Sequence, residues 1–181
     1  MSQAHCPLCG HSDTEPYHGH QNAVDDPGYR AFLSRLTTPL TERLSPPATG
    51  LDFGCGPGPA LAAMLREAGY TVALYDPFYA PDDAALAPGY DFITATEVVE
   101  HLARPGAELR RPAGLLRPGG WLGIMTKLVI DRERFAGWHY IRDPTHIGFF
   151  SREAFAWWAV AEGLGLELAG DDVIFLRRLP L

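Results

Sequence analysis

The sequence predicts an α/β fold in which helices cover both faces of a mostly parallel β-sheet. From residue 49 onward, short apolar stretches of strand length alternate with stretches of helical periodicity. A glycine-rich turn at residues 54–58 joins the first expected strand to the helix that follows it. Of the 181 residues, 46% are hydrophobic, which is enough for one domain with a core and too few for two large ones.

The expected elements can be placed along the chain from its turn-forming, proline and capping residues and from its apolar periodicity. Residues 1–28 hold turn formers without apolar periodicity, so we expect an irregular segment there and one domain over residues 29–181. A helix over residues 32–44 should be broken or kinked at Pro39, and Pro112 should bend a later one. Ser151 can cap the last helix. Strands are expected at 49–53, 71–75, 91–95, 121–127, 166–168 and 173–177, the last two as a hairpin, and helices at 59–68, 107–116 and 151–162.

Charge and cysteine content exclude several classes of function. The formal net charge of −7 disfavours a nucleic-acid partner, because an acidic chain repels phosphates. No apolar stretch is long enough to span a bilayer, and the N-terminus lacks the pattern of a secretory signal. Three cysteines do not make a disulfide framework, so we expect a cytoplasmic protein. The oligomeric state is not predicted.

The turn Gly54-Cys55-Gly56-Pro57-Gly58 is the strongest functional signal. It follows the first strand, at the edge where open α/β sheets bind ligands. Its glycines let a ligand approach the backbone, and the next helix directs its first amides to the same place. Alone, it could be a tight turn without a ligand. Asp76 at the end of the second strand favours a nucleoside, because a carboxylate there can accept hydrogen bonds from both ribose hydroxyls.

Three details favour S-adenosylmethionine over a nicotinamide cofactor. The glycine spacing is G-x-G-x-G, whereas dinucleotide-binding turns have G-x-G-x-x-G. Pro57 and Pro59 flank the last glycine. Asp52 precedes the first glycine, where its charge could meet a cationic amino group and would repel a diphosphate.

Four segments together resemble the class I methyltransferases. Residues 51–58 resemble the first motif of that family, residues 75–78 its acidic second motif, residues 90–102 its fourth-strand segment and residues 115–122 the turn before its fifth strand. The resemblance implies a doubly wound, Rossmann-like, seven-stranded sheet whose last strand is antiparallel. It also implies in-line transfer of a methyl group from the sulfonium of S-adenosylmethionine to a nucleophile.

The resemblance also assigns roles to residues of the cofactor site. The glycine loop would contact the methionine part, Asp76 would hold the ribose, Phe78 would lie beside the adenine, and Glu97 would line the pocket. The full set expected to bind the cofactor is Asp52, Gly54, Cys55, Gly56, Gly58, Asp76, Pro77, Phe78, Thr96 and Glu97.

Residues 138–150 are the candidate acceptor site, because they combine stacking and proton-exchanging side chains. In relatives with a similar run, this loop closes over the active site. We expect His139 or His146 to act as base or substrate contact, with Tyr140 and Trp138 as walls. Alternatively, the aromatic residues are core and backbone partners satisfy the histidines. His101 is a further candidate.

The pair Cys6 and Cys9 looks like one knuckle of a zinc ribbon. A second such pair is missing, so either His18 and His20 complete a zinc site or the knuckle is a remnant; we favour the remnant. The leading functional hypothesis is an enzyme that methylates a small molecule. The alternatives are a non-catalytic S-adenosylmethionine-binding module and, against the glycine spacing, a nicotinamide oxidoreductase.

Overall fold

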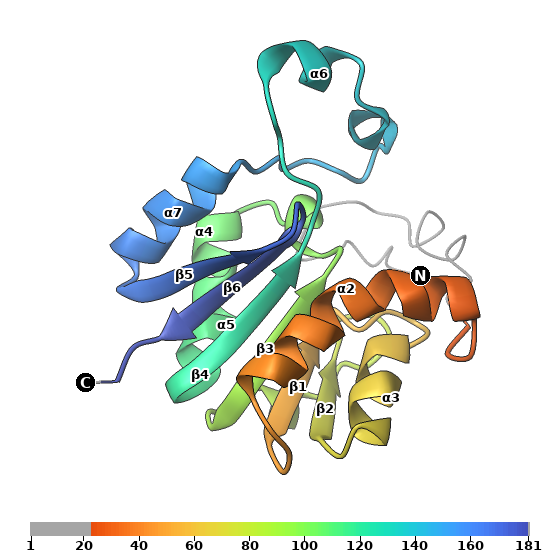
Figure 1. Cartoon of the computed structure of the whole chain (residues 1–181), viewed down its shortest axis with the longest axis vertical. Helices are drawn as coiled ribbons and strands as arrows, with labels where there is room; N and C mark the ends of the chain where they lie inside the picture. The colour runs from red at the N-terminus through yellow and green to blue at the C-terminus, as the bar shows by residue number, and fades with distance from the viewer. Residues whose placement is uncertain (1–22, 181) are drawn as a thin grey trace, which may run out of the picture.

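The computed structural model describes residues 23–180, which form one six-stranded sheet with helices on both faces (Figure 1). The strand order is β2-β1-β3-β4-β6-β5, parallel from β2 to β4, and β6 runs antiparallel to both of its neighbours. The strands are β1 (Thr49–Phe53), β2 (Thr71–Tyr75), β3 (Tyr90–Thr96), β4 (Leu116–Met125), β5 (Leu164–Ala169) and β6 (Val173–Arg178). The predicted α/β class and the closing antiparallel hairpin are therefore confirmed.

The expected number of seven strands is wrong by one in the described part of the chain. Residues 76–89 connect β2 to β3 and contain only the 3₁₀ helix η1 (Asp83–Leu86). A parallel crossover alone needs a dozen or more residues. This connection is therefore too short to supply another strand together with its own crossover.

Alternate residues along the strands pack against different helices. Phe92 of β3 lies in the cluster under α2 (Pro27–Arg43) and α3 (Ala60–Glu67). Its neighbour Ile93 lies in the opposite cluster. That second cluster packs under α5 (Arg110–Leu115) and α7 (Arg152–Ala161), which lie with the short α4 (Pro105–Glu108) away from α2 in Figure 1. The expected cap of α7 is present, because the Ser151 hydroxyl accepts a hydrogen bond from the amide of Ala154.

Helix α2 departs from the sequence prediction at both its start and its middle. It begins at Pro27, inside the segment expected to be irregular, because Asp26 caps it through the amide of Tyr29. It also continues through Pro39, so of the expected break or kink the break does not occur. A proline inside a helix costs about 3 kcal/mol. Leu36 and Leu40 on either side of it are fully buried, and each contributes about 1.5–3 kcal/mol, so packing outweighs the cost.

The helix expected over residues 107–116 is divided into α4 and α5 at Leu109. Pro112 lies inside α5 and has no amide hydrogen for the carbonyl of Glu108. The predicted interruption is thus confirmed, and it falls one turn ahead of the proline that causes it.

Residues 126–150, here called the β4–α7 segment, extend beyond the carboxyl ends of the strands (Figure 1). The segment contains α6 (Arg132–Ala136) and the 3₁₀ helix η3 (His139–Arg142). It is attached to the 3₁₀ helix η2 (Val99–His101) after β3, because the carbonyl of Glu100 accepts hydrogen bonds from two amides of the segment. Among the described residues, no helix is long and apolar enough to cross a bilayer.

Candidate active site

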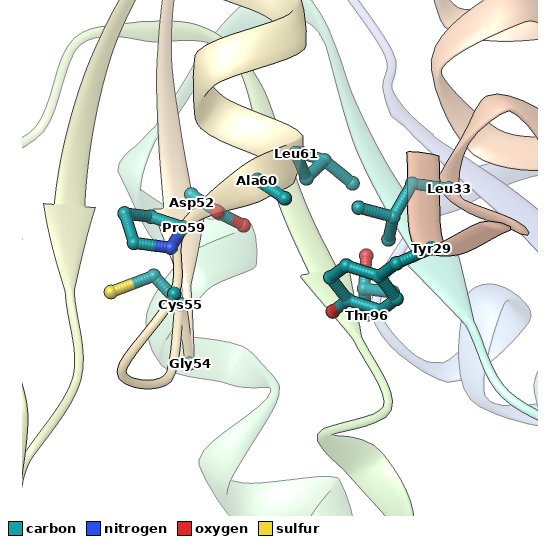
Figure 2. Close-up of a pocket in the computed structure, with 10 residues that line it drawn as sticks. Tyr29, Leu33, Asp52, Gly54, Cys55, Pro59, Ala60, Leu61 and Thr96 are labelled. Carbon is teal, nitrogen blue, oxygen red and sulfur yellow. The ribbon is translucent and has the colours of Figure 1, made fainter. Parts of the chain in front are cut away.

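A small pocket opens between α2 and the glycine-rich turn at the carboxyl ends of β1 and β3 (Figure 2). Asp52 and Thr96 enter it from the two strands, as the sequence predicts. Tyr29 and Leu33 enter from α2 and were not predicted, although their i, i+4 spacing places them on one helix face. The lining residues are Tyr29, Leu33, Asp52, Gly54, Cys55, Gly58, Pro59, Ala60, Leu61 and Thr96.

The glycine turn depends on its glycines for conformation. Gly54 has φ +75° and Gly56 has φ +62°, both in the left-handed region that other residues rarely adopt. A Cβ atom on Gly54 would also lie 2.5 Å from a methyl group of Val98. Around the corresponding position on Gly56, no described atom lies within 4 Å, so space is open beside the turn.

Asp76 connects the glycine turn to the end of β2. Its buried carboxylate accepts hydrogen bonds from the amide of Gly56 at 3.0 Å and from the amides of Phe78 and Tyr79 at 2.8 and 3.1 Å. Oδ1 accepts two of these bonds and Oδ2 accepts one, so Oδ2 retains capacity for a further donor. The predicted ribose-binding residue therefore also orders the backbone around its own site.

The pocket is acidic, and burial controls the ionisation of its walls. Burial raises the pKa of Asp52 to about 6, while a hydrogen bond from Thr94 at 2.9 Å opposes that rise. Burial, followed by the charges of Asp52 and Asp76, raises the pKa of Cys55 to about 12. Cys55 is thus a neutral thiol at physiological pH and unsuited to act as a nucleophile.

These residues fit S-adenosylmethionine. The hydroxyl of Thr96 is buried and has no hydrogen-bond partner among the described residues, although it belongs to a residue that lines the pocket. A ligand that meets this hydroxyl would remove the cost of leaving it unpaired. The carboxylates of Asp52 and Asp76 favour a ligand with cationic groups and oppose a diphosphate.

Next to the pocket, Glu97 begins a buried polar cluster. Glu97 has φ +52°, which is rare for a residue with a side chain, and its amide donates to the carbonyl of Met125 at 2.9 Å. Burial, followed by the charge of Glu100, raises its pKa to about 8. The hydroxyl of Tyr140 donates to Glu100 and lies 3.4 Å from Glu97. Burial and the same two carboxylates raise the pKa of this hydroxyl far above its ordinary value, so Tyr140 stays protonated.

The structure brings together two of the three residues predicted to be catalytic. Tyr140 and His146 are in contact, with their ring centroids 4.0 Å apart and His146 Nδ1 2.8 Å from the carbonyl oxygen of Tyr140. His139 is exposed, and its Nε2 lies 2.8 Å from the ammonium of Lys127. The ring centroid of Trp138 lies 5.0 Å from that of Tyr140.

His101 lies close to the predicted set. Its ring lies 4.9 Å from that of His146, and its Nδ1 lies 2.9 Å from the carbonyl oxygen of Thr145. Burial lowers its pKa, which favours the neutral ring. Sequence reasoning did not single out Glu100, Thr126 or Lys127, because their importance depends on contacts with residues 12 to 40 positions away along the chain. Cys6, Cys9, His18 and His20 lie outside the described residues.

Comparison with known proteins identifies the family. Residues 27–169 match the family model described as a methyltransferase domain. The chain therefore belongs to this family, which confirms the class predicted from the sequence, an S-adenosylmethionine-dependent methyltransferase domain. The matched region begins at the start of α2 and covers the strands up to β5.

Curated relatives and solved structures agree with this family. A ubiquinone biosynthesis O-methyltransferase of Burkholderia lata is 41% identical over 42% of this chain and 43% of its own length. A second ubiquinone biosynthesis O-methyltransferase, from Paraburkholderia xenovorans, is 32% identical over 43% of this chain and 44% of its own length. The chain thus spans less than half the length of these relatives. The 1,6-didemethyltoxoflavin-N1-methyltransferase of Burkholderia thailandensis, solved with S-adenosylhomocysteine, shares the fold with a TM-score of 0.63, 21% identity, and coverage of 92% of this chain and 85% of that one.

Proposed function

We propose that this chain binds S-adenosylmethionine in the pocket of Figure 2 and transfers the methyl group to a hydroxyl of a small phenolic acceptor. The observation that carries the proposal is the adjacency of Thr96 and Glu97. Thr96 lines the cofactor pocket, and Glu97 reaches toward the buried hydroxyl of Tyr140 beside the β4–α7 segment. One strand end thus joins the cofactor pocket to a group that can accept a proton.

On the cofactor side, the role of the residues is to bind S-adenosylmethionine and to orient it. The glycine turn would face the methionine part, Asp52 its ammonium group and Asp76 the ribose, while Pro77 and Phe78 would flank the adenine. When bound, S-adenosylmethionine supplies an electrophilic methyl group on a sulfonium. The protein aligns the acceptor with this group and excludes water.

On the acceptor side, Glu97 is the proposed base for the acceptor hydroxyl. Its pKa of about 8 is close to working pH, where a general base is most useful. A phenol has a pKa near 10, so the transfer to Glu97 is only modestly uphill. Tyr140 and Trp138 would form the walls, with His146 packed against Tyr140, and the exposed His139 would contact the acceptor at the entrance.

The names of the curated relatives support an oxygen acceptor on a quinol-like ring. The net charge of −7 supports a small molecule over a nucleic acid. We also propose a cytoplasmic site of action, as the sequence predicts.

Calorimetry and a methyl-transfer assay test this function together. The chain should bind S-adenosylhomocysteine and not NAD, and it should methylate members of a panel of catechols and phenols. Glu97→Gln should retain cofactor binding and lose turnover by roughly 100-fold, in the range of general-base removal. Glu133→Gln on the exposed face of α6 is the matched control and should keep full activity. NAD binding, or cofactor binding without methylation of any panel member, would contradict the proposal.

A further inference from the structure

Three potential metal ligands converge where η2 meets the β4–α7 segment. Glu100 and His101 come from η2, and His146 follows η3. One carboxylate oxygen of Glu100 and one ring nitrogen of each histidine lie within 4.8 Å of one another. Glu100 is fully buried, and the two histidines are half-buried.

The backbone holds these segments together. The amides of Ile147 and Gly148, next to His146, donate to the carbonyl of Glu100 at 2.8 and 2.9 Å. The cluster is therefore fixed by main-chain hydrogen bonds and does not depend on side-chain contacts alone.

Both histidines are oriented in the way that metal-binding histidines require. Nδ1 of His101 lies 2.9 Å from the carbonyl oxygen of Thr145, and Nδ1 of His146 lies 2.8 Å from that of Tyr140. A carbonyl oxygen only accepts, so each Nδ1 carries the hydrogen and each Nε2 of the neutral ring carries a lone pair. A backbone carbonyl on the far nitrogen is a common support of a ligating histidine.

Glu100 can also bind an ion while it keeps its present contacts. One oxygen accepts from Tyr140 and the other from Thr126 at 3.0 Å, which leaves acceptor capacity on both. Asp143 adds a carboxylate 3.8 Å from Nε2 of His146, and Glu97 adds another near the Tyr140 hydroxyl. The surroundings therefore favour a cation.

We propose that Glu100, His101 and His146 bind one divalent first-row transition-metal ion. Two imidazoles and one carboxylate suit zinc, cobalt or iron and leave coordination positions for water or an acceptor oxygen. With metal–ligand bonds of about 2.0–2.2 Å, the side chains must close in slightly around the ion. The metal-site proposal does not rest on the methyl-transfer proposal or on the pair Cys6 and Cys9, although Glu100 and His146 both contact Tyr140.

Cobalt binding to the full chain tests the site. Cys6→Ser and Cys9→Ser are introduced first, so that their thiolates do not compete, and the protein is stripped with a chelator. Calorimetry and visible absorption should show one Co²⁺ per chain, displaced by Zn²⁺. His146→Asn should weaken binding at least about tenfold, because asparagine keeps a donor near the place of Nδ1 but has no Nε2.

His139→Asn in the same background is the matched control, and its Co²⁺ affinity should be unchanged, since His139 pairs with Lys127 outside the cluster. Paramagnetic shifts in the protein with its histidines intact provide a second readout that needs no histidine variant. The ring signals of His101 and His146 should show the large contact shifts of bonded ligands, whereas those of His139 should show only smaller through-space shifts. Absence of Co²⁺ binding, equal affinity in folded His146→Asn, or contact shifts at other histidines in place of His101 and His146 would overturn the proposal.

Discussion

The cofactor side and the acceptor side of the candidate active site are built in different ways. On the cofactor side, the glycine turn forms one wall of the pocket, and Asp76 accepts backbone hydrogen bonds that hold this turn and residues 78–79 in place. Helix α2 and Thr96 also line the pocket. On the acceptor side, Glu97 after β3, Glu100 of η2 and two side chains of the β4–α7 segment form one buried hydrogen-bond network around Tyr140. The first region is therefore sensitive to backbone geometry, and the second to single functional groups.

This contrast has a physical reason. A turn that presents amides needs only its own φ and ψ angles, which nearby glycines allow. A network of carboxylates and hydroxyls in a buried site needs partners from several elements, because each unpaired member costs free energy. Single substitutions should therefore damage the two regions separately.

The largest expected effect is a loss of cofactor binding in Gly54→Val. The new side chain would have φ +75° and would collide with Val98, so we expect the affinity for S-adenosylhomocysteine to fall roughly 100-fold or more. Gly137→Ala, in the β4–α7 segment, has negative φ and open space and should bind normally. Calorimetry measures the affinity of both variants for S-adenosylhomocysteine. Normal binding by Gly54→Val would show that the turn is not the cofactor site.

An intermediate effect is expected for Tyr140→Phe, which removes the hydroxyl that Glu100 accepts from. Turnover should fall about 10- to 100-fold, while the affinity for S-adenosylhomocysteine should change less than about twofold. The free energy of unfolding should fall by about 1–3 kcal/mol, because a buried carboxylate loses a donor.

Tyr90→Phe is the control for that variant, since Tyr90 is also buried and donates at 2.7 Å to the carbonyl of Ala85, away from the site. It should lose some stability and keep full turnover. A parallel loss of cofactor affinity in Tyr140→Phe would mean that the two regions are not separable.

The smallest expected effect is a pH dependence of cofactor affinity that belongs to Asp52. With a pKa of about 6, Asp52 is mostly protonated at pH 5 and mostly ionised at pH 7. If its charge pairs with the ammonium group, the affinity should be about tenfold weaker at pH 5 than at pH 7. Asp52→Asn should bind more weakly and lose this difference. Calorimetry of the unmutated chain and of Asp52→Asn at pH 5 and pH 7 measures this change in affinity. An equal pH dependence in the two proteins would exclude a pairing of Asp52 with the ammonium group.

The same shift has the opposite sign for stability. Because the folded pKa lies above the ordinary value of 3.8, the folded carboxyl holds its proton more tightly than the unfolded one. Asp52 therefore lowers the free energy of unfolding as pH rises from about 4 to 6. A ligand cation would offset this cost at neutral pH.

Much of the fold could be predicted, because strands and capped helices follow local patterns. β1 and β2 match their predicted bounds, and α7 begins directly after the predicted cap at Ser151. The failures have tertiary causes. Burial of Leu36 and Leu40 carries α2 through Pro39, and the connection after β2 has no room for a seventh strand.

The sequence by itself determined the family, the glycine turn and the acidic residue after β2, because these depend on short stretches whose spacing reflects backbone geometry. Tertiary structure decided which other side chains meet. It placed Tyr29 of α2 in the cofactor pocket and packed Tyr140 against His146, while His139 is exposed and contacts Lys127. It also brought Glu100 and His101 to His146, a contact between residues more than forty positions apart that no local pattern encodes.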